Sequence, residues 1–209
     1  ANCRDMVRDW RHDEQTILLS LSPLSHHIAW VALGQALTIG AEFVVNDLSN
    51  DRSTLDWIIE TRANYVLGVP THAIDLQAEQ KTRDMTKIGN LKIFYLSGAA
   101  IPPTVAEVFI KQGITPQNVY GMSENSSHQY THPTDNYSTI INTCGRGGKS
   151  YEICIFDIKD ANLELNPGKI GQIGGRGACL MLGYFDNQRA TEAAFNENGW
   201  FLSGDIGRL

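Results

Sequence analysis

Asn118–Glu124, with the sequence Asn-Val-Tyr-Gly-Met-Ser-Glu, is the stretch around which the rest of the chain is organised. An apolar run typical of a β-strand ends there in a glycine. Tyr120 can stack on a base, Ser123 can donate a hydrogen bond to a phosphate oxygen, and Glu124 is a hard oxygen ligand for Mg²⁺. A core tyrosine followed by a polar loop explains the same residues when they are taken alone. The neighbouring segments therefore have to decide between a nucleotide site and an ordinary core tyrosine.

Strand-like and helical segments alternate upstream of this stretch. Short apolar runs bounded by proline, glycine or small residues predict strands at Thr16–Leu21, Glu42–Asn46, Tyr65–Val69, Leu91–Leu96 and Asn118–Tyr120. Helical spacing and helix-start residues predict helices at Ala1–Arg11, His26–Ile39, Ser53–Arg62, Thr71–Gln80 and from Pro102 to Lys111. Ser25 is the predicted N-cap of the second helix, and Gly40 its C-terminal stop. The fold class expected is α/β, with a mostly parallel sheet flanked by helices.

The sequence pattern changes after about Thr139, where frequent glycines separate short apolar runs. Tyr151–Asp157 partly alternates, as a half-exposed antiparallel strand does, a helix follows at about Asn187–Phe195, and a last strand is predicted at Trp200–Gly207. We expect a small antiparallel β subdomain here. The predicted domains are therefore residues 1–138, an α/β subdomain, and residues 139–209, a β-rich subdomain.

The amino-acid composition favours a globular protein and argues against some classes of function. An apolar fraction of 42% with 19% charged residues is typical of a globular core. The net charge of −6 and the dispersed lysines and arginines argue against a nucleic-acid partner. No apolar stretch approaches the ~20 residues that a membrane span needs. The four cysteines are widely separated, which predicts reduced thiols and a cytoplasmic location. The sequence favours no particular oligomeric state.

Three further clusters stand at predicted strand ends. The small turn Ser97–Ala100 lets a flat ligand approach the backbone closely, although an ordinary tight turn explains it as well. Asp205, at the end of Gly199–Asp205, can accept two hydroxyl hydrogen bonds, or can be a turn aspartate. His26 and His27 can line a pocket at a strand-to-helix junction, but no third ligand is near in sequence, so a metal site there is not expected.

In this order, these stretches resemble the family of acyl-adenylate-forming enzymes, which includes acyl-CoA synthetases, adenylation domains of peptide synthetases and luciferases. Ser97–Ile101 is similar to the family's small-residue adenine turn, and Tyr120–Glu124 to its Tyr-Gly-x-Thr-Glu signature, with Ser123 replacing threonine. Arg176-Gly177 with Met181–Tyr184 resembles the Arg-Gly…Gly-Tyr strand of the family. Gly199–Asp205 resembles its Gly-Trp…Thr-Gly-Asp motif. The resemblance covers essentially the whole chain.

The resemblance implies a role for each matching residue. It assigns nucleotide binding to Gly98, Ala99, Ala100, Asn118, Tyr120, Gly121, Ser123 and Asp205. Ser123 and Glu124 are the expected catalytic residues, with Ser123 on the α-phosphate and Glu124 holding Mg²⁺. Asp205 is expected to bind the ribose hydroxyls, and His26 to lie near the acyl pocket.

The resemblance also implies a reaction and its substrates. A carboxylate attacks the α-phosphate of ATP to give acyl-AMP, and the thiol of CoA then displaces AMP, a chemistry that belongs to fatty acid metabolism among other pathways. The family's phosphate loop and its C-terminal lid domain have no counterpart in the 209 residues, so we expect an internal fragment that is inactive alone. Loading of a carrier-protein thiol, an aryl-acid ligase and a nucleotide-binding module without ligase activity stay open. Medium-chain, alicyclic and aromatic acids are all compatible with the sequence.

Overall fold

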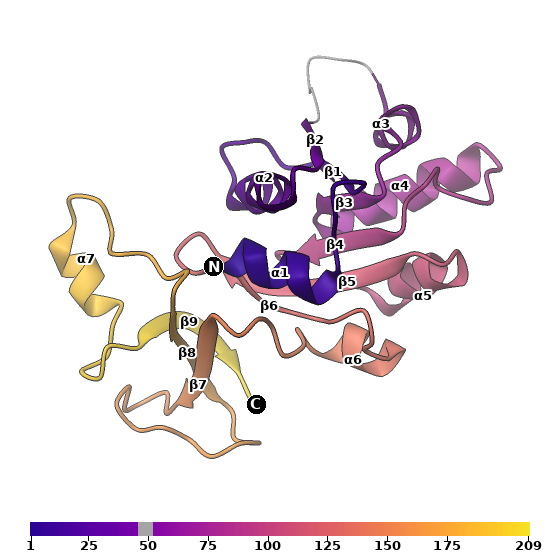
Figure 1. Ribbon diagram of the computed structural model, residues 1–209. Coiled ribbons are helices and arrows are strands. Elements are labelled where there is room, and N and C mark those ends of the chain that lie inside the picture. The colour runs from indigo at the N-terminus through magenta and orange to yellow at the C-terminus, as the bar shows by residue number, and fades with distance from the viewer. Residues whose placement is uncertain (46–51) are drawn as a thin grey trace. The chain divides into compact units, whose positions relative to one another are not determined.

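The computed structural model describes residues 1–45 and 52–209, which fall into two compact units. The larger unit comprises Asn2–Gly148, and the smaller comprises Lys149–Leu209 together with Ala1. Each unit has its own sheet (Figure 1). The assignment of domains 1–138 and 139–209 stays a prediction for the whole protein.

The larger unit is built on a six-stranded sheet. Its strands are β1 (Ile17–Ser20), β2 (Glu42–Val45), β3 (Tyr65–Gly68), β4 (Ile93–Ser97), β5 (Thr115–Met122) and β6 (Ser126–Tyr130). Their spatial order is β2-β1-β3-β4-β5-β6, with every pairing parallel except the antiparallel pair β5–β6. The predicted mostly parallel sheet is confirmed. Of the predicted strand Glu42–Asn46, the last residue lies outside the described residues.

Helices cover both faces of this sheet and create two cores. They are α1 (Asn2–Trp10), α2 (His27–Ile39), α3 (Thr54–Thr61), α4 (Pro70–Thr82), α5 (Pro103–Lys111) and α6 (Tyr137–Asn142). Side chains alternate across each strand, so Val66 of β3 packs with α3, α4 and α5, whereas Tyr65 and Leu67 pack with α1 and α2. Burial on both faces explains why these strands are continuous apolar runs rather than alternating ones.

The start of α2 differs from the prediction. His26, not Ser25, is the N-cap, and its Nδ1 accepts a hydrogen bond from the Ile28 amide at 3.4 Å. The Ser25 prediction was wrong because the chain still turns at that point, with the His26 amide donating to the Pro23 carbonyl at 2.9 Å. Gly40 ends the helix at φ 69°, in the left-handed region, as predicted.

β6 was not predicted from the sequence. The strand predicted to end at Tyr120 continues to Met122, because the polar segment Ser126–Tyr130 folds back and pairs with it. Ser127 and Tyr130 are fully buried, and the Ser127 Oγ lies 2.5 Å from the Tyr95 hydroxyl. A strand that satisfies buried hydroxyls in this way lacks the apolar run that sequence patterns detect.

The smaller unit is a three-stranded antiparallel sheet, as predicted. Its elements are β7 (Tyr151–Phe156), β8 (Gly171–Gly177), α7 (Gln188–Ala193) and β9 (Phe201–Gly207), with strand order β7-β8-β9. A Cβ on Gly174 would lie 2.5 Å from the Phe156 ring, and one on Gly175 2.4 Å from the Tyr151 ring. The glycines of β8 therefore make room for the aromatic rings of β7.

No helix in the described part of the chain has the length and apolar character that a membrane crossing requires.

Candidate functional site

The carboxyl ends of five parallel strands, β1 to β5, lie along one edge of the larger unit's sheet. β1 has β2 on one side and β3 on the other, so the chain reverses its direction of winding between β1 and β3. Ligands of such sheets bind outside the carboxyl ends of the strands, at the point where the strand order reverses. All the predicted site residues except Asp205 lie in the last residues of these strands or in the segments that follow them.

The predicted adenine turn follows β4 directly. Ser97 is buried and pairs with Val119 of β5, and Gly98 then turns the chain at φ 88°. A glycine suits this left-handed conformation because it has no Cβ to clash. Gly98, Ala99 and Ala100 are exposed. Because Tyr120 follows Val119, the turn and the tyrosine stand at the ends of two hydrogen-bonded strands.

Tyr120 is half-buried and its ring is held by a neighbour. The His128 ring of β6 meets it edge-on, with the centroids 5.5 Å apart and the planes at 86°. Burial lowers the pKa of His128 to about 3, so the imidazole is neutral at physiological pH. A neutral edge-on contact fixes the orientation of the aromatic face without placing a charge beside it.

Asn118 already uses its amide inside the protein. The side chain is buried, and its Nδ2 donates to the carbonyl of Ile140 at 2.9 Å and to that of Thr143 at 3.0 Å. Its amide therefore ties α6 and the following residue to β5. A contact between this side chain and adenine can only be made through Oδ1, since both amide hydrogens are engaged.

The segment Gly121–Glu124 spans the end of β5 and the first residues of the turn to β6. A Cβ on Gly121 would lie 1.8 Å from the Ser126 carbonyl oxygen, so only glycine fits this close backbone crossing. Asn125 closes the turn: its Oδ1 accepts from the Met122 amide at 3.0 Å, and its own amide donates to the Met122 carbonyl at 3.2 Å. The turn leaves Ser123 exposed and Glu124 half-buried at its tip.

Two histidines stand at the start of α2, on the same edge. The His26 and His27 rings lie 4.9 Å apart, and the Nε2 atom of His27 is buried without a hydrogen-bond partner. Burial lowers the pKa of His27, His26 adds to that shift, and the nearby Glu124 carboxylate opposes it. The predicted acyl-pocket residue His26 and the predicted metal ligand Glu124 thus both lie near His27.

His72 is a rim residue to which the sequence analysis gave no role. It follows β3 by one turn of α4, is half-buried, and its Nδ1 accepts from the Val69 amide at 3.3 Å. Burial lowers its pKa. Its position two residues after Pro70, which ends a strand, is the signal that could have singled it out.

Glu124 belongs to no multi-ligand metal cluster within the described part of the chain. Among the described residues, no three histidine, cysteine, aspartate or glutamate side chains are grouped so that they could hold a metal ion. A single carboxylate still fits Mg²⁺, which usually keeps several waters and binds through one or two carboxylates plus phosphate oxygens.

Asp205, the predicted ribose ligand, lies in the smaller unit on β9. Its amide donates to the Ser203 Oγ at 3.1 Å, and that hydroxyl donates to the Ile173 carbonyl at 2.8 Å. Ser203 therefore fixes the backbone at Asp205 and the neighbouring strand at once. Asp205 is exposed. Because it belongs to the other unit, its part in a common site stays a prediction.

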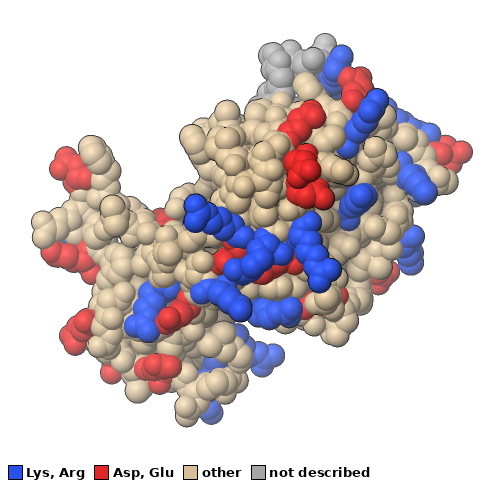
Figure 2. Space-filling model, viewed as in Figure 1, with Lys and Arg blue, Asp and Glu red and all other residues tan. Residues whose placement is uncertain are grey.

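Lysine and arginine side chains gather over α1 (Figure 2). Arg4, Arg8 and Arg11 recur at helical spacing and are exposed. Arg8 is compensated locally, since its guanidinium lies 2.9 Å from Asp5 and 2.8 Å from Asp9. These basic side chains thus form a partly neutralised helix face, in which the arginine is exposed and the two carboxylates are largely covered.

Comparison with known proteins decides the family. Residues 1–185 match the family of AMP-binding enzymes. The chain belongs to the AMP-binding enzyme family. This AMP-binding chain is 30% identical over 212 residues to the medium-chain fatty-acid–CoA ligase of Escherichia coli strain K12, a match that covers 100% of the chain and 36% of the relative. It is 27% identical over 202 residues to the 2,3-dihydroxybenzoate-AMP ligase of Bacillus subtilis strain 168, covering 94% of the chain and 36% of the relative.

Solved structures show the same fold. A long-chain-fatty-acid–CoA ligase from Archaeoglobus fulgidus superposes with a TM-score of 0.87 at 19% identity, over 100% of the AMP-binding chain and 44% of that structure. O-succinylbenzoate coenzyme A synthetase from Bacillus subtilis, in complex with AMP, superposes with a TM-score of 0.82 at 23% identity. The match covers 99% of the AMP-binding chain and 41% of that structure. The chain spans about a third of the length of the curated relatives it matches.

Proposed function

We propose that this chain is the nucleotide-binding part of an AMP-forming acid–thiol ligase, most simply an acyl-CoA synthetase. The observation that carries the proposal is the pairing of Ser97 with Val119, which sets the exposed turn Gly98–Ala100 beside Tyr120 at the carboxyl edge. A flat base fits between a small-residue backbone turn and an aromatic face. The substrates proposed for the whole protein are ATP, a carboxylic acid and CoA.

In this proposal the residues of the larger unit act by binding and orienting. Tyr120 stacks on adenine while the backbone of Ala99 and Ala100 lines the opposite side. The Ser123 hydroxyl donates to an oxygen of the α-phosphate. Asp205 of the smaller unit accepts hydrogen bonds from the ribose hydroxyls. None of these side chains forms a covalent intermediate, so catalysis rests on positioning and electrostatics.

Glu124 is the residue proposed to hold Mg²⁺. Its half-buried place in the β5–β6 turn, four residues beyond Tyr120, suits an ion that also binds phosphate oxygens. When bound, the ion supplies positive charge that offsets the repulsion between the carboxylate and the phosphates. The His27 Nε2, buried and unpaired beside Glu124, belongs with His26 to the wall proposed for the acid.

A second candidate is an aryl-acid ligase or an adenylation domain that loads a carrier-protein thiol. The similarity to the 2,3-dihydroxybenzoate-AMP ligase favours it, because the identity is nearly as high as to the medium-chain ligase. A third candidate, from a different class, is a module that binds nucleotide without ligase activity. A cytoplasmic location is part of the proposal for all three, on the acidity of the chain, its cysteines and the need for ATP.

The test uses the full-length protein and a panel of medium-chain, alicyclic and aromatic acids. Acid-dependent exchange of pyrophosphate into ATP is expected, followed by release of AMP when CoA is added. No exchange with any acid would leave the nucleotide-binding module as the function. Exchange followed by AMP release with a carrier protein, but not with CoA, would replace the acyl-CoA synthetase by the carrier-loading enzyme.

A further inference from the structure

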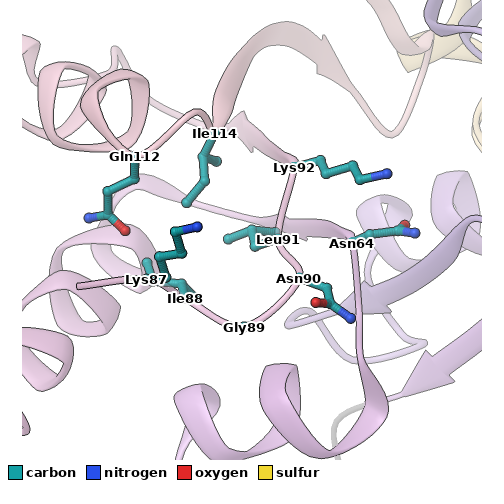
Figure 3. Close-up of a pocket in the computed structure, with 9 residues that line it drawn as sticks. All are labelled: Asn64, Lys87, Ile88, Gly89, Asn90, Leu91, Lys92, Gln112 and Ile114. Carbon is teal, nitrogen blue, oxygen red and sulfur yellow. The ribbon is translucent and has the colours of Figure 1, made fainter. Parts of the chain in front are cut away.

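A pocket of about 400 Å³ opens at the amino edge of the larger unit's sheet, at the opposite ends of the strands from the candidate site (Figure 3). It is formed where the chain enters β4 and β5 and where it leaves α3 for β3. The described lining residues are Asn64, Lys87, Ile88, Gly89, Asn90, Leu91, Lys92, Gln112 and Ile114. The volume is within the range of small-molecule sites. Neither the nucleotide nor the acid of the proposed reaction uses this edge.

The floor of the pocket is apolar. Ile88, Leu91 and Ile114 are buried members of the core beneath α3, α4 and α5, with exposed fractions of 1%, 7% and 2%. The Leu91 amide donates to the Ile88 carbonyl at 3.0 Å, which fixes the loop that carries both residues. These side chains are already packed in the core, so the apolar area that they offer to a ligand is small and belongs mostly to Leu91.

The polar walls of the pocket are held by the protein itself. The Asn64 Oδ1 accepts from the Ile17 amide at 3.0 Å, and its Nδ2 donates to the Gln15 carbonyl at 3.2 Å. Gln112 and Gln80 exchange a reciprocal pair of amide hydrogen bonds, both 3.0 Å long. These walls are thus formed before any ligand arrives, and the side chains that remain for a ligand are Lys87, Asn90 and Lys92.

The charge of the pocket is positive. The described lining residues include Lys87 and Lys92 and no aspartate or glutamate. Neither lysine has an ion pair within the described ranges, although the chain as a whole carries a net charge of −6. In Figure 3 the Lys87 side chain extends over the region between Leu91 and Ile114, whereas that of Lys92 extends away from it. One ammonium group therefore stands above the apolar floor.

We propose that this pocket binds a small organic anion that has a single anionic group and a short apolar body. Lys87 pairs with the anionic group, Asn90 can donate to it, and the short apolar body lies against the small apolar floor, chiefly Leu91. A cation is repelled by the two lysines. An inorganic anion lacks the body that the floor accommodates, and a neutral alcohol lacks the charge that Lys87 attracts.

Pentanesulfonate is a suitable probe because it has no carboxyl group that an acid-activating site could use. Titrated into the full-length protein with labelled methyl groups, it is expected to shift the NMR signals of Ile88, Leu91 and Ile114 saturably. Inorganic sulfate and pentanol, each tested alone, are expected to bind at least about tenfold more weakly.

The matched variants separate charge from structure. Lys87→Met is expected to weaken pentanesulfonate binding by about tenfold or more, and Lys87→Arg, which keeps the charge, to restore it. Lys81→Met removes an exposed lysine of α4 that does not line the pocket, and its affinity is expected to equal that of the unmodified protein. Absence of saturable shifts at the three residues overturns the proposal. So does equal binding of sulfate or pentanol, or an affinity that Lys87→Met leaves unchanged.

Discussion

At the scale of single residues, the candidate site combines side chains that are committed to the fold with side chains that face a ligand. Asn118 and Asn125 use their amides to hold α6 and the β5–β6 turn. Ser123 and Glu124 stand at the tip of that turn and carry the proposed chemistry. Within these eight residues, some side chains hold the fold and others face the proposed ligand. Single substitutions can therefore distinguish effects on stability from effects on activity.

Glu124→Gln tests the proposed metal ligand. The amide keeps the size and loses the negative charge, so the Mg²⁺-dependent pyrophosphate exchange of the full-length protein is expected to fall by at least about tenfold. Its melting temperature is expected to stay unchanged. Glu107→Gln, an exposed carboxylate of α5, is the control and should keep full activity. Exchange at the unmodified rate in Glu124→Gln would remove Glu124 from the site.

Asn118→Asp tests a structural task at the same strand. The change replaces the two donors that reach the carbonyls of Ile140 and Thr143 by a carboxylate that faces them. We expect the free energy of unfolding of the chain to drop by about 2 kcal/mol, because the buried Ile140 carbonyl and the part-buried bond to the Thr143 carbonyl both lose their donor. Denaturant titration measures it. A drop below about 0.5 kcal/mol would show that these bonds do not hold α6.

At the scale of elements, the β5–β6 hairpin organises the site more than either strand does. β5 belongs to the parallel sheet, and β6 reverses direction, so the turn between them projects from the carboxyl edge. The register shifts between Tyr120 and Met122, where the backbones of Gly121 and Ser126 cross. This irregularity sets the direction of the residues after Tyr120.

Gly121→Ala probes that crossing. The new Cβ would overlap the Ser126 carbonyl oxygen, which is backbone and cannot move aside cheaply. A loss of roughly 2–4 kcal/mol in the free energy of unfolding is expected. Gly113→Ala is the matched control: nothing lies within 4 Å of its Cβ, and its φ of 77° alone costs about 1 kcal/mol. Equal losses in the two variants, measured by denaturant unfolding, would contradict the proposed overlap.

At the scale of the whole molecule, buried histidines make stability depend on pH. The His12 ring stacks on Tyr65 at 4.6 Å, its Nε2 is buried, and burial lowers its pKa to about 4 while Asp13 opposes the shift. The unfolded chain binds this proton near pH 6.5, so the unfolded state is favoured as the pH falls from 6.5 to about 4. Stability is full above that window.

His12→Phe keeps an aromatic ring on Tyr65 and removes the titrating group. The unmodified chain is expected to lose up to roughly 3 kcal/mol between pH 6.5 and 4 through this histidine, and the variant to lose correspondingly less. The measurement is the free energy of unfolding in denaturant at several pH values. The same slope in both proteins would show that His12 does not contribute to acid sensitivity.

The sequence by itself determined the parts of this protein that rest on local patterns. Apolar runs such as Tyr65–Val69 and stops such as Gly40 lie close to the observed β3 and to the end of α2. The motif around Tyr120 indicated the family that residues 1–185 match. A strand that is buried on both faces needs a continuous apolar run, and a left-handed helix end favours glycine. Both requirements concern only a few consecutive residues, so they can be recognised in the sequence.

Only the tertiary structure decided what depends on partners distant in the chain. Ser126–Tyr130 is polar and becomes a strand because β5 and Tyr95 satisfy its buried groups. The Asn118 side chain donates hydrogen bonds to carbonyls more than twenty residues away in the sequence. Lys87 and Ile114 are distant in the sequence but line the same pocket. Each of these outcomes follows from pairing or close approach in space, which composition and periodicity do not encode.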